Sequence, residues 1–288
     1  MKAVDFDYER PRSVAALCGR LAEAGADAKI LAGGQTLVPL MAMRLARPSL
    51  LLDINAIAEL QGIAFTAGAV AIRACTRQAA ALADETVRLH LPLLEKALRF
   101  VGHVQTRNRG TIGGSLANAD PAAEIAIVAL TLDAAMTARS ASGERTIAAA
   151  DFFHAPMETA LAPEECLTEV RFPVWSEEGR IGAGFQEVSV RQSDFALSAA
   201  AAQIALGHDG TCRRIALCVG GASATPQRMK AAEERLLGTR LEARDLADAA
   251  ALVHDAVNPL EDHHASRRYR RRVAAALVER AVAEAVAA

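Results

Sequence analysis

The chain has 288 residues, of which 52% are hydrophobic and only 4% aromatic, and 32 Lys and Arg against 34 Asp and Glu leave a formal net charge of −2. This length suffices for two modest domains or three small ones. The near-neutral charge argues against nucleic acid as the main partner. No run approaches about 18 uninterrupted apolar residues, and the charged N-terminal segment lacks an apolar signal region. We therefore expect a cytoplasmic protein without a membrane span.

The first third of the chain predicts a small α/β unit. Residues 11–25 have apolar positions at helical spacing, begin with Pro11 and end at Gly25. Two apolar runs, 28–32 and 49–54, read as short strands, and 64–74 reads as a hairpin.

The middle third predicts a second unit. Residues 84–102 favour a helix, and 107–124 favour a long glycine-containing loop. Residues 124–134 are apolar and are assigned to a helix. A hairpin is expected over 137–147, around Ser142-Gly143, and a strand over 166–175.

The last third predicts an α+β module. Three strand-like runs (182–190, 196–206 and 212–221) precede three helical segments (226–237, 242–256 and 265–286). Strands followed by helices favour a three-stranded antiparallel sheet covered on one face.

Two glycine pairs carry the chemistry, Gly33-Gly34 in LAGGQTLV and Gly113-Gly114 in TIGGS. Because glycine lacks Cβ, the backbone amides of such loops can approach an oxyanion closely. The flanking side chains Gln35, Thr36, Thr111 and Ser115 add hydrogen-bond donors. Neither loop has the GxGxxG pattern or the lysine of a Walker loop. The residues alone therefore indicate an anionic ligand, most economically a diphosphate held between the loops, with tight strand-to-helix turns as the alternative.

The five cysteines indicate no metal chemistry, because they are scattered and form no CxxC pair. We expect reduced, structural thiols and no iron–sulfur cluster in this chain. Ser-His-Asp and HExxH signatures are also missing, so no catalytic side chain and no metal ligand is assigned.

Two segments, 28–54 and 104–124, strongly resemble the FAD-binding medium subunits of molybdenum hydroxylases. The nearest resemblance is to the medium subunit of aerobic carbon monoxide dehydrogenase, with the flavin domain of xanthine dehydrogenase more distant. Residues 188–201 are similar to the family's segment near the flavin ring. The resemblance implies an FAD-binding domain of the vanillyl-alcohol-oxidase-like (PCMH) type over 1–175, with subdomains at about 1–57 and 58–175. An α+β flavoprotein C-terminal domain over 176–288 is implied to follow.

The same resemblance implies the residues that contact FAD. The diphosphate would lie against 32–36 and 111–115, and Lys29 would lie near the adenosine. Asp120 and Glu124 would accept hydrogen bonds from ribose or ring, with helix capping as the alternative. The implied set is Lys29, Leu31, Ala32, Gly33, Gly34, Gln35, Thr36, Leu37, Val38, Val101, His103, Thr111, Ile112, Gly113, Gly114, Ser115, Asp120, Glu124, Leu167 and Gln186.

Several positions leave alternatives open. His103 either contacts the flavin or ends a helix, and Phe195 either positions the ring or is a core aromatic. Gln186 stands where xanthine dehydrogenases have a lysine, while Arg73 and Thr106 depart from the family's usual glycine and isoleucine. Five arginines in 266–272 form either a solvated helix start or a docking surface for a partner.

The resemblance implies a role in electron transfer. A large molybdenum-cofactor subunit would oxidise the substrate, and a small subunit with two iron–sulfur clusters would pass electrons to FAD. FAD would then pass them to NAD+, a quinone or another acceptor. The alternatives are a stand-alone flavin oxidoreductase of the same superfamily and a flavin-free assembly module.

Overall fold

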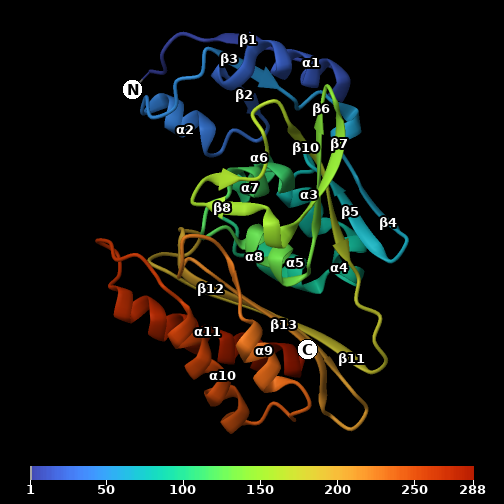
Figure 1. Ribbon diagram of the computed structural model, residues 1–288, viewed down its shortest axis with the longest axis vertical. Helices are drawn as coiled ribbons and strands as arrows, with labels where there is room; N and C mark the ends of the chain where they lie inside the picture. The colour runs from blue at the N-terminus through green and yellow to red at the C-terminus, as the bar shows by residue number, and fades with distance from the viewer. Residues whose placement is uncertain (1) are drawn as a thin grey trace.

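The computed structural model describes residues 2–288, arranged in three tiers along the long axis (Figure 1). The N-terminal unit forms one end, a central unit follows, and a C-terminal unit of one sheet and three helices forms the other end. No helix within 2–288 is long and apolar enough to cross a lipid bilayer.

The N-terminal unit contains a parallel sheet in the order β1-β3-β2. Helix α1 covers it with the buried side chains of Val14, Leu17 and Leu21, and the hydroxyl of Ser13 caps the helix by accepting from the N–H of Ala16. The elements are β1 Asp7–Glu9, α1 Val14–Ala24, β2 Ala28–Leu31, α2 Leu37–Ala42 and β3 Leu50–Asp53, with short 3₁₀ turns at Gly25–Asp27 and Ala58–Leu60.

The central unit is built on a five-stranded antiparallel sheet in the order β4-β5-β10-β6-β7. Six short helices pack beside it, and a small β8-β9 hairpin follows a 3₁₀ turn at Ala149–Asp151. The strands are β4 Ile63–Thr66, β5 Ala69–Arg73, β6 Ala135–Ser140, β7 Gly143–Ala148, β8 Phe153–Ala155, β9 Glu158–Thr159 and β10 Cys166–Pro173. The helices are α3 Gln78–Ala83, α4 Glu85–His90, α5 Pro92–Leu98, α6 Val104–Arg109, α7 Ile112–Asn118 and α8 Glu124–Thr131.

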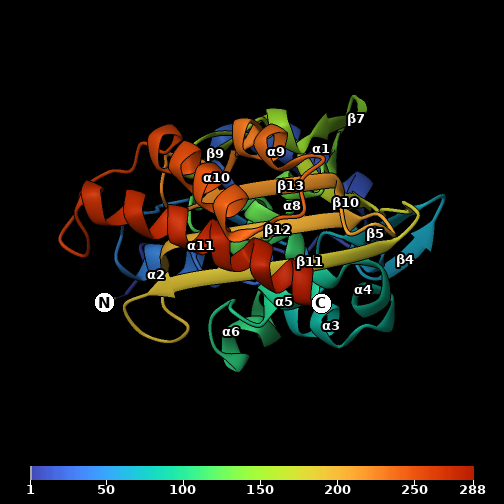
Figure 2. The ribbon, with the colours of Figure 1, turned by 90° about the horizontal axis from the view of Figure 1, so that it is seen from below.

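The C-terminal unit has four antiparallel strands in the order β11-β12-β13-β14. Its helices lie in front of the strands when the molecule is seen from below (Figure 2), and α5 and α8 of the central unit pack on the other face. The elements are β11 Arg180–Ser189, β12 Ala196–Leu206, β13 Cys212–Gly220, β14 Gln227–Arg228, α9 Lys230–Leu236, α10 Ala243–Ala256 and α11 Arg267–Ala287.

Helix α11 lies unusually close to the edge strand β11. A Cβ added to Gly182 would collide with the carbonyl oxygen of Ala285, and one added to Gly184 would collide with that of Ala281. These two glycines therefore let the helix backbone rest directly on the strand.

The hydrophobic core crosses from the central unit into the C-terminal unit. Helix α8 is buried on every side from Ile125 to Thr131, and its cluster includes Ala183 and Phe185 of β11 and Ala199 of β12. The sheet of the C-terminal unit is therefore covered on both faces, by its own helices on one and by the central unit on the other. The strand pattern predicted cover on one face only.

Three further predictions need correction. The segment 107–124 holds parts of two helices, α6 and α7, rather than one long loop, and 84–102 is divided because Pro92 starts a new helix. The last sheet has a fourth strand, the two-residue β14. The strand β1 was not predicted, since three residues give no readable alternation.

Candidate functional site

A cavity of about 700 Å³ opens where the three units meet. Its wall includes the strand-to-helix segment of the N-terminal unit, the start of α7 in the central unit, and the loop between β11 and β12. A volume of this size is typical of cofactor pockets. Most of the predicted FAD contacts line it: Lys29, Leu31, Ala32, Gly33, Gly34, Gln35, Thr36, Leu37, Val101, Thr111, Gly113, Gly114, Ser115, Asp120, Glu124 and Leu167.

The first glycine loop presents unused backbone donors. Within residues 2–288, no hydrogen-bond acceptor pairs with the N–H groups of Gly33, Gly34, Gln35 or Thr36. Gly34 has a φ of +72°, and the side-chain amide of Gln35 folds back onto the carbonyl of Gly33 at 3.2 Å. Consecutive free amides around a residue of positive φ form a concave anion-binding nest.

The second glycine loop differs, because the chain itself satisfies its amides. The N–H of Gly113 donates to the carbonyl of Ala74 at 2.9 Å, that of Gly114 donates to Thr111 Oγ1 at 3.0 Å, and that of Ser115 donates to the Thr111 carbonyl. The prediction of two equivalent amide cradles is therefore wrong. This loop offers the hydroxyl of Ser115, while Thr111 acts as the N-cap of α7.

The glycines also allow close packing of the backbone around the cavity. A Cβ on Gly33 would lie 2.5 Å from the carbonyl oxygen of Arg109 and 2.9 Å from Cα of Gly110, and one on Gly113 would strike Ala74. These residues are small because neighbouring backbone segments pack directly against them. The close packing brings the two loops to one cavity.

The acidic segment after α7 lines the cavity beside the second loop. Asp120 Oδ1 accepts from the N–H of Ala122 at 2.9 Å, which shapes the turn into α8, and Glu124 is the first residue of that helix. Burial is the main cause that raises the pKa of Glu124 to about 7, and the nearby charge of Asp120 adds to the shift.

The loop between β11 and β12 closes another side of the cavity. Asp194 accepts from the N–H of Phe195 at 3.0 Å and pairs with Arg191 at 3.1 Å, and these contacts lower the pKa of Asp194. Phe195 is 73% exposed. A core role for Phe195 is therefore wrong, and its ring is available to a ligand.

Four residues of the predicted set do not line the cavity. Val38 is exposed on α2, and Ile112 is fully buried in the central core. His103 is the exposed N-cap residue of α6, as its helix-end alternative predicted. The side-chain amide of Gln186 donates to Glu284 at 2.9 Å.

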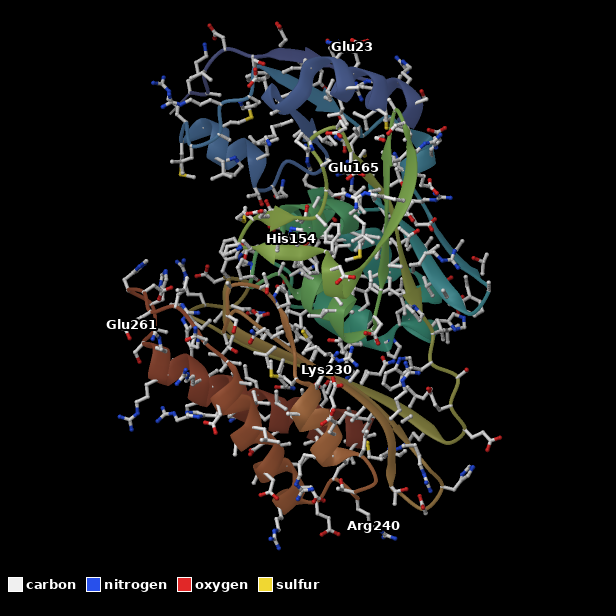
Figure 3. All side chains as sticks on the ribbon, in the orientation of Figure 1. Glu23, His154, Glu165, Lys230, Arg240 and Glu261 are labelled. Atoms are coloured by element: carbon white, nitrogen blue, oxygen red, sulfur yellow. The ribbon has the colours of Figure 1, made fainter. Side chains whose placement is uncertain are left out.

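Other lining residues had no signal in the sequence. Gln78 at the start of α3 is buried, and its Oε1 has no hydrogen-bond partner within the described chain. Glu165 lines the wall and is held by Arg145, whose Nε and Nη2 donate to its two oxygens at 2.6 and 2.7 Å; Figure 3 shows it between the N-terminal and central units. Each position depends on long-range packing, which no local motif reports.

The two departures from the family pattern lie in different places. Thr106 lines the cavity, and its carbonyl accepts from the N–H of Gly110 at 2.6 Å. Arg73 is absent from the lining and pairs with Glu169 at 3.3 Å.

Most of the arginine cluster in 266–272 is used within the chain. Arg267 donates to the carbonyl of Pro259, Arg271 to that of Val257, and Arg270 to those of Leu197 and Gly221. These contacts anchor the start of α11, so the cluster is not simply a solvated helix start.

All five cysteines are buried free thiols. Across residues 2–288, no group of three or more His, Cys, Asp or Glu side chains is arranged to hold a metal ion.

Comparison with known families accounts for nearly the whole chain. Residues 4–175 match the FAD binding domain in molybdopterin dehydrogenase, and residues 183–285 match the CO dehydrogenase flavoprotein C-terminal domain.

Characterised relatives align over almost their full lengths. The chain is 41% identical over 286 residues to the 6-hydroxypseudooxynicotine dehydrogenase complex subunit alpha of Paenarthrobacter nicotinovorans, covering 99% of this chain and 96% of that protein. It is 38% identical over 288 residues to caffeine dehydrogenase subunit beta of Pseudomonas sp. (strain CBB1), covering 99% and 96%.

Solved structures agree in fold. The CO dehydrogenase from Oligotropha carboxidovorans superposes with a TM-score of 0.96 at 33% identity, and quinoline 2-oxidoreductase from Pseudomonas putida 86 with 0.95 at 34%; each match covers 100% of this chain and 99% of the other. The cavity, its nest of free amides and these likenesses agree, and the chain belongs to the family of FAD-binding flavoprotein subunits of molybdenum-containing dehydrogenases.

Proposed function

We propose that this chain is the electron-transfer flavoprotein of a three-subunit molybdenum hydroxylase in the cytoplasm. The chain holds FAD where electrons arrive from the iron–sulfur clusters of a small partner subunit, after a large molybdenum-cofactor subunit has oxidised the substrate. NAD+, a quinone or another acceptor then takes these electrons. The observation that carries the proposal is the cavity of about 700 Å³ between the nest at 33–36 and the start of α7.

The residues of the cavity suit FAD in their chemistry. The free amides of the nest would hold the diphosphate, and the Ser115 hydroxyl across the cavity would donate to the same group. The buried, unpartnered Oε1 of Gln78 would accept from a hydroxyl of the cofactor. Phe195 would contact the ring system with its exposed face.

The chain's own part in the reaction is to bind and orient. When bound, FAD supplies the redox chemistry, and the protein supplies position and electrostatics. The loop holding Phe195 shields one side of the cavity, and α8 presents Glu124 to its interior. Substrate chemistry is assigned to the large partner subunit, as the likeness to the flavoprotein subunits of molybdenum-containing dehydrogenases implies.

The test is the visible absorption spectrum and metal content of the complex purified after co-expression with its neighbouring genes. We expect one flavin per chain, together with iron and molybdenum contributed by the other chains. A flavin without iron or molybdenum would favour a stand-alone flavin oxidoreductase. An intact complex without flavin would contradict the proposal.

Two glycine variants test the cavity itself. Gly33→Val is expected to lose FAD, because the added atoms strike the Arg109 carbonyl and separate the two loops. Gly19→Ala is the control, since a Cβ there meets nothing within 4 Å. Stoichiometric flavin in Gly33→Val would refute this description of the site.

A further inference from the structure

A buried arginine lies where the pairing between β12 and β13 ends. The last pair at this end of the two strands is Ala199 and Gly220, and Leu197 and Gly221 lie just beyond it. Arg270, near the start of α11, is only 7% exposed. Its Nη1 donates to the carbonyl of Leu197 at 2.7 Å and to that of Gly221 at 3.2 Å. One side chain therefore joins the two strands where their own pairing stops.

The guanidinium of Arg270 is held from its other side by a carboxylate. Its Nη2 donates to Asp262 at 2.7 Å. Asp262 in turn accepts from the N–H groups of His264 at 2.9 Å and Ala265 at 3.0 Å. This partner is needed, because a buried charge without one is strongly disfavoured. Acceptors on two sides of one planar group fix its orientation.

Both carbonyls that Arg270 holds belong to segments that continue into walls of the cavity. Leu197 directly follows the loop between β11 and β12, whose residues 193–196 line the cavity. The N–H of Gly221 donates at 2.8 Å to the carbonyl of Pro121, and the residues on either side of Pro121 in the acidic segment line the cavity as well. Gly221 also lies against the start of β12, because a Cβ there would come within 3.1 Å of the carbonyl oxygen of Ala196. The guanidinium therefore fixes two walls relative to each other.

We propose that Arg270 is a positioning residue for the flavin ring, because it holds the loop that carries Phe195 in place against the acidic segment after α7. The inference rests on the proposed function, since it names FAD as the ligand. Among the described residues, all polar contacts of Arg270 are with the C-terminal unit, whereas the nest at 33–36 lies in the N-terminal unit. Arg270 should therefore affect binding of the ring and leave binding of the diphosphate unchanged.

The first test compares FAD with ADP, which carries the adenosine and the diphosphate without the flavin ring. The Kd for FAD is measured on the purified complex stripped of flavin, and the Kd for ADP is obtained from its competition with FAD. In Arg270→Lys we expect the Kd for FAD to rise about tenfold, because an ammonium group cannot replace the planar guanidinium and the loosened walls must be ordered on binding. The Kd for ADP should not change.

Arg271→Lys is the matched control. Arg271 is the next residue of the same helix, and its Nε donates at 3.0 Å to the carbonyl of Val257, which is not a cavity-lining residue. The control makes the same change of side chain and also removes an anchor of α11, but it should leave both Kd values unchanged. A general loss of stability at the start of α11 would instead affect the two variants alike.

The second test is a double-mutant cycle with Phe195. Phe195→Ala removes an exposed side chain and should weaken FAD binding through loss of its contact with the ring. If Arg270 acts by placing this loop, the two effects overlap. The Kd for FAD of the variant with both changes should then rise by less than the product of the two single rises.

Asp262→Asn provides a milder variant in case Arg270→Lys does not assemble into the complex. It leaves Arg270 in place and changes a side chain that is partly exposed. The guanidinium loses its charged partner and holds the two walls less firmly, so the Kd for FAD should rise by less than in Arg270→Lys. The Kd for ADP should again be unchanged.

The outcomes separate this inference from the proposed function. Equal rises in the Kd for FAD and the Kd for ADP, or fully independent effects in the double-mutant cycle, would overturn the role of Arg270 and leave the proposed function standing. An unchanged Kd for FAD in Arg270→Lys, or in Asp262→Asn where that variant takes its place, would also overturn it. Absence of FAD binding by the unaltered complex would overturn the proposed function, and this inference with it.

Discussion

At the scale of single residues, Thr111 lines the cavity and also has a structural role. Its hydroxyl accepts from the N–H of Gly114 and caps α7. Thr111→Val should lower the free energy of unfolding by about 1 kcal/mol, because the N-cap bond is lost. Urea unfolding measures the change, and Thr111→Ser should restore most of it. A stable Thr111→Val protein that loses FAD would instead point to direct contact with the ligand.

The contacts of Asp262 at the start of α11 should make the stability of the protein sensitive to acid. It accepts from the N–H groups of His264 and Ala265 and pairs with Arg270 at 2.7 Å, and these contacts lower its pKa to about 2. A depressed pKa contributes stability that is present above the unfolded pKa of about 3.9 and is lost as pH falls toward 2. Asp262→Asn should therefore lower Tm at pH 7, and the deficit should shrink below pH 4.

The control for this prediction is Asp151→Asn, an exposed aspartate without a hydrogen-bond partner in the described chain. It should not change Tm at either pH. If the Tm of Asp262→Asn stayed below that of the unaltered protein by the same amount from pH 7 to pH 2.5, the lowered pKa of Asp262 would be contradicted.

The candidate site was predictable from the sequence only in part. The pairs Gly33-Gly34 and Gly113-Gly114 indicated an anion site, and resemblance specified FAD. Their residue types could not show that the amides of the first loop are free, while those of the second loop form hydrogen bonds within the chain. That difference depends in part on a distant partner, because the Gly113 amide pairs with the carbonyl of Ala74, which local sequence does not report. The amides of Gly114 and Ser115 pair with the neighbouring Thr111.

At the scale of elements, one substitution made at two glycines should have opposite effects. Gly184→Ala places a Cβ against the carbonyl of Ala281 and should cost about 1–3 kcal/mol of stability, because α11 must move off the strand. Gly19→Ala lies inside α1 with open space around it and should gain about 1 kcal/mol. Urea unfolding of both variants measures these changes in stability. If Gly184→Ala did not change stability, the contact between β11 and α11 would be looser than the structure indicates.

Elements marked by a clear apolar pattern were predictable, and those without one were not. The pattern of α1, the hairpin β4–β5 and the strands of the last sheet were confirmed with small shifts at their ends. Helices α6 and α7 were missed because 107–114 contains three glycines and an asparagine, whose preferences favour a loop. Tertiary packing and the Thr111 cap overcome those preferences.

At the scale of the whole molecule, Glu284 connects the central and C-terminal units. Its carboxylate pairs with Lys96 of α5 and accepts from the N–H of Phe185 at 3.0 Å. Glu284→Ala leaves these two donors and the side-chain amide of Gln186 without their acceptor and should cost about 1–3 kcal/mol. Glu279→Ala, on the same helix but without a polar partner in the described chain, should change stability much less. Similar urea midpoints for both variants would contradict the role of Glu284 in holding the two units together.

The number of structural units was predictable from the sequence, but the way in which they pack against one another was not. Composition suggested two or three domains, and the division at 175/176 remains a prediction. The apolar character of 124–134 identified a buried helix without showing what buries it. Side chains on one face of β11 and β12 bury this helix. Which residues do so can be read only from the folded sheet.

The shared core has a consequence for biosynthesis. Helix α8 emerges from the ribosome well before β12 and β13, which later cover one of its sides. At about 5–20 residues per second, its apolar surface stays open for several seconds in every newly made chain. During this interval a chaperone can bind the surface or neighbouring nascent chains can aggregate through it, so the yield of folded subunit depends on how quickly translation reaches residue 220.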